Sequence, residues 1–158
     1  MIKLRWFVAA AALLLVSSPV QSTHAEDSNA VALAESTGAF GGALLWSTYL
    51  GFVQTEQQLD AAPKSVQPIN VALHMANLGT VEKYIEKLRK EFKDDSSMLS
   101  FLDSMAETTD AVKAQGSSLQ DCIKTGPKGL DDVKDKHATA KKALVKLLGM
   151  QEAEAKLP

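Results

Sequence analysis

Two histidines lie on helical stripes that are otherwise mostly apolar. His74 belongs to the series Val71, His74, Leu78, Val81, Ile85, Leu88 and Phe92, and His137 to the series Leu130, Val133, His137, Ala140, Leu144 and Leu147. Spacings of three and four residues place one side chain per turn on a single face of an α-helix. An imidazole on such a face either hydrogen-bonds a neighbouring polar group or binds haem iron or a metal ion.

The haem or metal hypothesis depends on the height of the two rings in a bundle. If successive helices alternate in direction, the helices that carry His74 and His137 run the same way. The two residues then lie about six and eight positions from their helix starts, a difference in height of roughly 3 Å. Bundles build cofactor sites from such inward-facing side chains, and Met75, Met98 and Met105 would be additional soft ligands.

The spacing of these residues is not that of a known ligand motif. The sequence contains neither His-x-x-x-His nor the Cys-x-x-Cys-His of attached haem. It therefore predicts no specific metal. A structural role for His74 and His137 is favoured, and haem or metal binding by the pair remains the alternative.

No other group of residues indicates an enzyme. Cys122 is the only cysteine, and the serines lie in no nucleophile-elbow context. The acidic pairs Asp94-Asp95 and Asp131-Asp132 fall at expected helix starts, where carboxylates favour the positive end of the helix dipole. We expect a protein without catalytic residues.

The pattern of the chain predicts four long helices, at about 28–60, 65–93, 94–124 and 130–148. The breaks between them contain Pro63, the run from Asp94 to Ser97, and Gly126-Pro127. The third stripe is Met98, Leu102, Met105, Thr109, Val112, Gly116, Leu119 and Ile123. Short connections between long amphipathic helices favour an all-α, four-helix antiparallel bundle with up-down-up-down topology.

The first of these helices has no charged residue between Glu35 and Glu56. Gly38 and Gly42 form a small-xxx-small pair that allows close helix packing. A helix that is apolar on all sides is typically buried or faces a partner. Peripheral membrane contact and a true membrane span are the alternatives. The aromatic residues Trp46, Tyr49 and Phe52 are the expected anchors of an interface, because aromatic side chains dominate interface energetics.

Residues 1–25 have the organisation of a cleavable signal peptide. Lys3 and Arg5 precede the apolar stretch from Trp6 to Val16, and Thr23-His24-Ala25 provides a small-residue cleavage site, with Ser22 as an alternative. The apolar stretch is too short for a membrane span. The sequence thus predicts a periplasmic or secreted protein, with a bundle domain at 26–150 and a flexible tail at 151–158.

The charge balance argues against nucleic acid as a partner. The chain has 17 basic and 19 acidic residues, and removal of Lys3 and Arg5 leaves 15 against 19, a net charge of −4. A mildly acidic domain of mixed charge has no field that attracts a phosphate backbone. The lone Cys122 allows no intrachain disulfide, and we expect it to be buried.

These patterns together predict an exported, non-enzymatic bundle that binds a protein partner, or a second copy of itself, through its first helix. The alternatives are a haem or metal protein that uses His74 and His137, and a protein that associates with a membrane through its first helix.

Overall fold

The computed structural model describes residues 25–149, and these residues are helical with short connections. The four long helices are α2 (Ala25–Ala61), α3 (Pro68–Glu91), α4 (Ser96–Thr125) and α5 (Leu130–Leu147), and two single 3₁₀ turns, η1 (Pro63–Ser65) and η2 (Pro127–Gly129), lie between them. The all-helical fold with four helices is confirmed for this part of the chain. The predicted signal peptide, apart from Ala25, and the predicted tail at 151–158 lie outside the described residues.

The helix ends follow the local signals. Asp95 is the N-cap of α4, and its carboxylate accepts the backbone N–H of Met98 at 2.9 Å. Gly126 ends α4 with a φ of 91°, a conformation that costs glycine little and other residues more. Pro68 occupies the first turn of α3, where a missing N–H removes no helical hydrogen bond.

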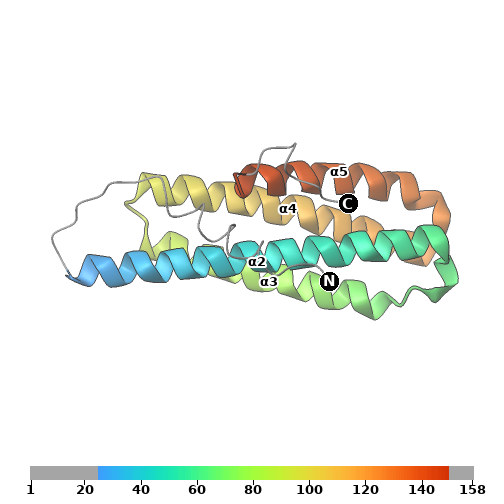
Figure 1. The fold of residues 1–158 in the computed structure, drawn as a ribbon, viewed down its shortest axis with the longest axis horizontal. Helices are drawn as coiled ribbons and strands as arrows, with labels where there is room; N and C mark the ends of the chain where they lie inside the picture. The colour runs from blue at the N-terminus through green and yellow to red at the C-terminus, as the bar shows by residue number, and fades with distance from the viewer. Residues whose placement is uncertain (1–24, 150–158) are drawn as a thin grey trace, which may run out of the picture.

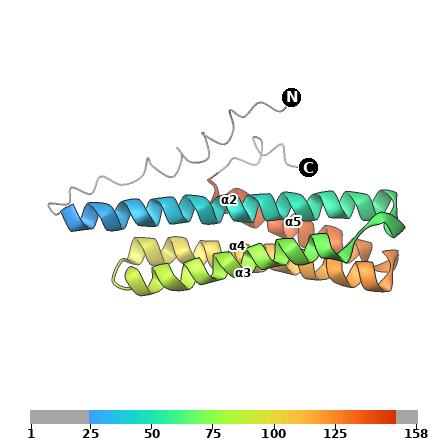
Figure 2. The same cartoon turned by 90° about the horizontal axis from the view of Figure 1, so that it is seen from below.

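The four helices lie side by side, and the chain reverses direction at each connection (Figure 1). The shortest helix, α5, starts at the end of the bundle where α2 meets α3 and stops partway along α4, whereas α2 extends past the α3–α4 turn at the other end (Figures 1 and 2). A full four-helix cross-section therefore exists only in the part of the bundle that α5 covers.

The core consists of the predicted stripes. Val71, Leu78, Val81, Leu102, Val112, Leu119, Val133, Ala140 and Leu144 are fully buried. The helix α2 contributes Leu45, Tyr49, Phe52, Val53 and Leu59 to the same cluster. Cys122 is buried as well, as its residue type predicts. Among residues 25–149, no helix is long and apolar enough to cross a membrane.

Several glycines allow side chains of neighbouring helices to fill the core, and Gly51 and Gly116 are two of them. A Cβ on Gly116 of α4 would lie 2.5 Å from the Phe52 ring and 2.6 Å from the Met75 sulfur, and a Cβ on Gly51 of α2 would overlap the His74 ring. In contrast, a Cβ on Gly79 of α3 would meet no atom within 4 Å. The cost of glycine in a helix is therefore offset by packing at the first two positions and not at Gly79.

This contrast predicts opposite effects for two alanine substitutions. Gly116→Ala should destabilise the fold by about 1–3 kcal/mol, because Phe52 and Met75 must move to admit the methyl group. Gly79→Ala should stabilise it by up to about 1 kcal/mol, because alanine is the better helix former. Urea unfolding followed by circular dichroism measures both changes. Equal effects of the two substitutions would contradict this packing.

Candidate functional site

A buried chain of three polar side chains connects α2 to α5. The His137 Nδ1 atom lies 2.8 Å from Glu56 Oε2, and its Nε2 atom lies 2.8 Å from the Tyr49 hydroxyl. An ionised carboxylate only accepts hydrogen bonds, so in the neutral imidazole the Nδ1–H group donates to Glu56. The other nitrogen then accepts the hydrogen bond that the Tyr49 phenol donates.

The protein interior encloses this chain. Tyr49 has 0% exposure, and the side chains of Glu56 and His137 are only 11% and 16% exposed. Burial raises the pKa of the Tyr49 phenol to about 12, and the nearby negative charge of Glu56 acts in the same direction. The phenol therefore keeps its proton at neutral pH and acts as a hydrogen-bond donor.

The spacing of Tyr49 and Glu56 along α2 places both side chains on one side of the helix. Tyr49 and Glu56 are seven residues apart, about two turns, so both side chains face α5 and the His137 ring lies between them. Glu56 was not among the predicted site residues. Its signal is present nonetheless, because Leu45, Tyr49, Phe52, Glu56 and Leu59 form one stripe of spacing four, three, four and three.

The second predicted ligand, His74, contacts a different side of α2. Its ring packs edge-on against Phe52, with centroids 5.7 Å apart, and lies over Gly51. Residues 49 and 51 point to nearly opposite sides of a helix, so the two imidazoles meet α2 at the same height on separate sides. The equal height agrees with the prediction. The two imidazoles do not, however, face one interior space where a cofactor could bind both.

The chemistry of His74 is that of a neutral ring. Its Nδ1 atom is buried with no hydrogen-bond partner among the described residues, and burial lowers the pKa of the imidazole. Residues 25–149 contain no group of three or more His, Cys, Asp or Glu side chains that could hold a metal ion. Haem or metal binding by His74 and His137 thus stays a prediction without a shared site.

A fourth polar side chain, Gln115 of α4, lies at the same level of the bundle. It is fully buried, and neither its amide nitrogen nor its amide oxygen has a partner within the described residues. On the same face of α4, the Thr108 hydroxyl donates to the Ser104 carbonyl at 2.8 Å and lies 3.4 Å from the Ala143 carbonyl of α5, and Ser118 hydrogen-bonds Asp132. Because these two contacts with α5 lie on either side of Gln115 along α4, we infer that its side chain lies towards α5. Gln115 was not among the predicted site residues.

The predicted interface anchors on α2 lie mostly inside the bundle. Tyr49 and Phe52 have 0% exposure and Gly38 is buried, Gly42 is half-buried, and Trp46 is partly exposed. Among the described residues, the large apolar side chains that are mostly exposed are Phe40, Ile69 and Leu73, with exposures of 50%, 55% and 61%. Phe40 was missed because the whole of α2 was assigned to one surface, and Ile69 and Leu73 were missed because only the buried stripe of their helix was considered.

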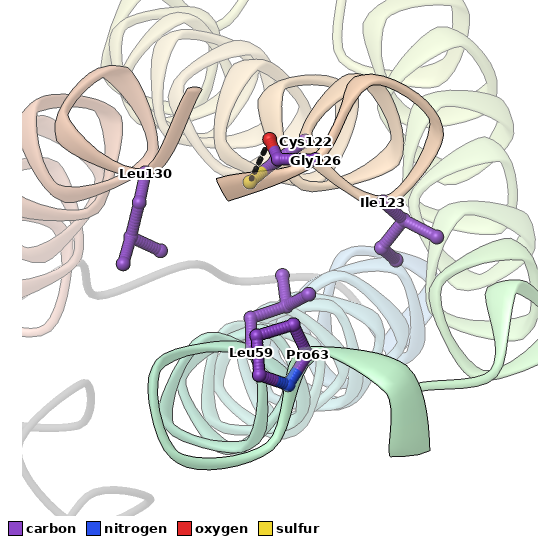
Figure 3. A pocket seen from close by; sticks show the side chains of 6 residues that line it. All are labelled: Leu59, Pro63, Cys122, Ile123, Gly126 and Leu130. Carbon is purple, nitrogen blue, oxygen red and sulfur yellow. Dashed lines mark hydrogen bonds between the residues drawn. The ribbon is translucent and has the colours of Figure 1, made fainter. Parts of the chain in front are cut away.

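A small cavity lies where the end of α2 approaches the end of α4 and the start of α5. Its volume is about 40 Å³, and its walls are Leu59, Pro63, Cys122, Ile123, Gly126 and Leu130 (Figure 3). The Cys122 thiol donates to the Gly126 carbonyl at 3.6 Å. No ionisable group other than this thiol lines the cavity, so the cavity provides no second polar site.

The polar chain should show strong coupling between its members. Replacing His137 alone by leucine leaves Glu56 buried without its partner and should cost about 3 kcal/mol of stability. The triple variant Tyr49→Phe, Glu56→Leu, His137→Leu removes all three polar groups together and should recover most of that loss. Urea unfolding of the variants measures the coupling. Additive losses would show that the three side chains do not act as a unit.

The raised pKa of Tyr49 predicts a loss of stability in alkali. Tyr49 has a pKa of about 12 in the folded chain, whereas an unperturbed tyrosine has a pKa of 10.0. The contribution of Tyr49 is therefore complete below about pH 10 and is lost as the pH rises towards 12. Between these pH values the wild type should lose about 2–3 kcal/mol more than Tyr49→Phe. Parallel stability curves for the two proteins would contradict this.

Comparison with known proteins gives no relative on which to base a function. No family model, no curated protein and no solved structure matches this chain. The function proposed for the chain therefore rests on its own contacts, exposures and charges.

Proposed function

We propose that this chain is an exported, non-enzymatic interaction protein, built as an up-down-up-down antiparallel four-helix bundle, that binds through one face formed by α2 and α3. The members of this uncharged α2–α3 face are exposed and carry no charge: Phe40, Ala43, Ser47, Gln54, Ile69, Leu73, Ala76 and Thr80. The observation that carries the proposal is that Phe40, Ile69 and Leu73, the exposed large apolar side chains of the described residues, all belong to it.

The charge distribution supports this assignment. The sequence has no Asp, Glu, Lys or Arg between Glu35 and Glu56 or between Lys64 and Glu82. Glu56 itself points inward to His137, so the next charged residue at the surface of α2 is Asp60. Interface centres are depleted of charge and surrounded by a polar rim, and this face has both features.

Contacts between the two helices make the face continuous. The Phe40 ring packs edge-on against Tyr84 with centroids 5.7 Å apart, and His74 lies over Gly51 about three turns farther along α2. The residues of each helix recur at spacings of three, four or seven, which place them on one side of that helix. Phe40 marks one end of the face, and Ile69 and Leu73 mark the other.

The occupant that this arrangement favours is a second copy of the chain. A two-fold axis through the middle of the face places Phe40 of each copy over Ile69 and Leu73 of the other, so both exposed ends are covered at once. The middle contains the small residues Ala43, Ser47 and Ala76, which allow helices to approach closely. A surface without charge also has no like-charge repulsion when it meets its own copy.

The size of the face sets the expected affinity. From Phe40 to Gln54 the helix rises about 21 Å, and two packed helices give a comparable width. Two such faces bury about 1,000 Å² in total, which is at the lower end of specific interfaces. A reversible dimer with a micromolar dissociation constant is therefore expected.

The oligomeric state tests the proposal. Sedimentation velocity over a concentration series should show a monomer–dimer equilibrium for the wild type. Ala43→Glu places a charge within the face, one turn from Phe40, and should give a monomer. The matched control, Ala138→Glu, adds the same charge at an exposed alanine of α5 and should leave the equilibrium unchanged.

Three results would overturn the proposed dimer. They are a wild type that stays monomeric at high micromolar concentration, an Ala43→Glu variant that still dimerises, and equal weakening by Ala43→Glu and Ala138→Glu. A monomer that binds to phospholipid vesicles would instead support membrane association through α2. Circular dichroism of each variant confirms that the charge has not unfolded the bundle.

A further inference from the structure

We propose that Tyr49 is a redox-active residue that gives up one electron through Trp46 to a one-electron oxidant and passes its proton to His137. The site consists of the indole of Trp46, the phenol of Tyr49, the imidazole of His137 and the carboxylate of Glu56. This activity is separate from the proposed docking face, because it uses the interior and the α5 side of α2.

The first requirement of such a site is a base on the phenol. Oxidation turns a phenol into a strong acid, so an electron leaves a tyrosine readily only when its proton has an acceptor. Tyr49 has 0% exposure, and its hydroxyl lies 2.8 Å from the Nε2 atom of His137. At this hydrogen-bond length the proton moves only a short way, along a bond that already exists.

The second requirement is a counter-charge for the base. Protonation of a buried imidazole is costly unless a negative group compensates the new charge. The Glu56 carboxylate lies 2.8 Å from the Nδ1 atom of His137 and is itself nearly buried. When Nε2 takes the proton, His137 and Glu56 become an ion pair with no net charge. Glu56 is therefore a positioning residue that acts through His137.

The third requirement is a path for the electron between the buried phenol and the surface. Trp46 lies one helical turn before Tyr49 on α2, with ring centroids 6.5 Å apart and ring planes inclined by 43°. Trp46 is partly exposed, whereas Tyr49 is not. The indole is thus the aromatic ring next to Tyr49 that an oxidant in solution can approach.

The step balances in electrons, protons and charge. A one-electron oxidant takes an electron from Trp46 and is reduced, which leaves the indole radical cation. That cation takes an electron from Tyr49 while the phenolic proton moves to His137 Nε2. The products are a neutral indole, a neutral phenoxyl radical on Tyr49 and an imidazolium on His137 paired with Glu56. The total charge of the four side chains after the second transfer equals that before it.

The composition of the chain allows a clean test. The sequence contains two tyrosines and two tryptophans. In a Trp6→Phe, Tyr84→Phe background, Trp46 and Tyr49 are therefore the remaining oxidisable aromatic rings of their kinds. Photogenerated tris(bipyridine)ruthenium(III) is the oxidant. We expect the tryptophan radical to form first and to decay as the electron paramagnetic resonance signal of a neutral tyrosyl radical appears.

Three variants in that background assign the roles. Tyr49→Phe should lose the tyrosyl signal and leave the tryptophan radical long-lived. His137→Gln should lose the signal as well, although Tyr49 is still present. The matched control is His74→Gln, which alters the other histidine of the described residues at the same height of α2 and should leave the signal unchanged. A tyrosyl yield in His137→Gln equal to that of the background would overturn the proposal.

A measurement on the background protein itself avoids any effect of His137→Gln on folding. If the proton moves with the electron, transfer from Tyr49 to the Trp46 radical should be slower in D₂O than in H₂O. Equal rates in the two solvents would overturn the proposal. So would a tryptophan radical that decays at the same rate with and without the Tyr49 hydroxyl.

Discussion

The buried charge of Glu56 is the constraint on which the arrangement of α2 and α5 depends. A carboxylate that is 11% exposed requires a partner, and His137 is that partner at 2.8 Å. Because α5 is the shortest helix, it has fewer apolar turns with which to dock. The hydrogen bonds from His137 to Glu56 and Tyr49 fix its height and rotation on α2, whereas leucine and valine contacts alone would allow other registers.

The inward orientation of Glu56 also determines the outer surface of the same helix. A carboxylate that pointed outward would end the uncharged stretch of α2 four residues before Asp60. Because Glu56 faces His137, the surface of α2 carries no charge from Ser36 to Leu59. One hydrogen-bonded pair in the interior thus shapes both the polar chain and the proposed docking face.

The helical pattern of the sequence was sufficient to predict the elements. The four segments and the stop at Gly126-Pro127 correspond to α2 through α5, and Asp95 is one of the predicted caps. The unusual histidines were correctly placed on core stripes, because periodicity reports which side of a helix a residue occupies. The equal height of His74 and His137 along the bundle also followed from counting residues at 1.5 Å per residue.

The partners of those histidines could not be predicted in the same way. Which side of α2 each imidazole meets depends on the rotation of three helices about their axes, and the sequence analysis treated α2 as apolar all round. Glu56 and Gln115 interrupt otherwise apolar stripes, as the histidines do. A charged residue on a predicted core stripe indicates that the facing stripe carries a polar residue as its partner.

The same rotation separates the roles of the aromatic residues on α2. Tyr49 and Phe52 are three residues apart and both buried, yet Tyr49 faces α5 and Phe52 packs towards His74 and Gly116. Phe40 reaches solvent beside Tyr84, and Trp46 lies at the border between the interior and solvent. An aromatic residue on an uncharged helix is therefore not in itself an interface anchor. Its role depends on which neighbouring helix it faces. On α2 this orientation is determined by the polar contacts of Glu56 and by the close contacts at Gly51 and Gly116.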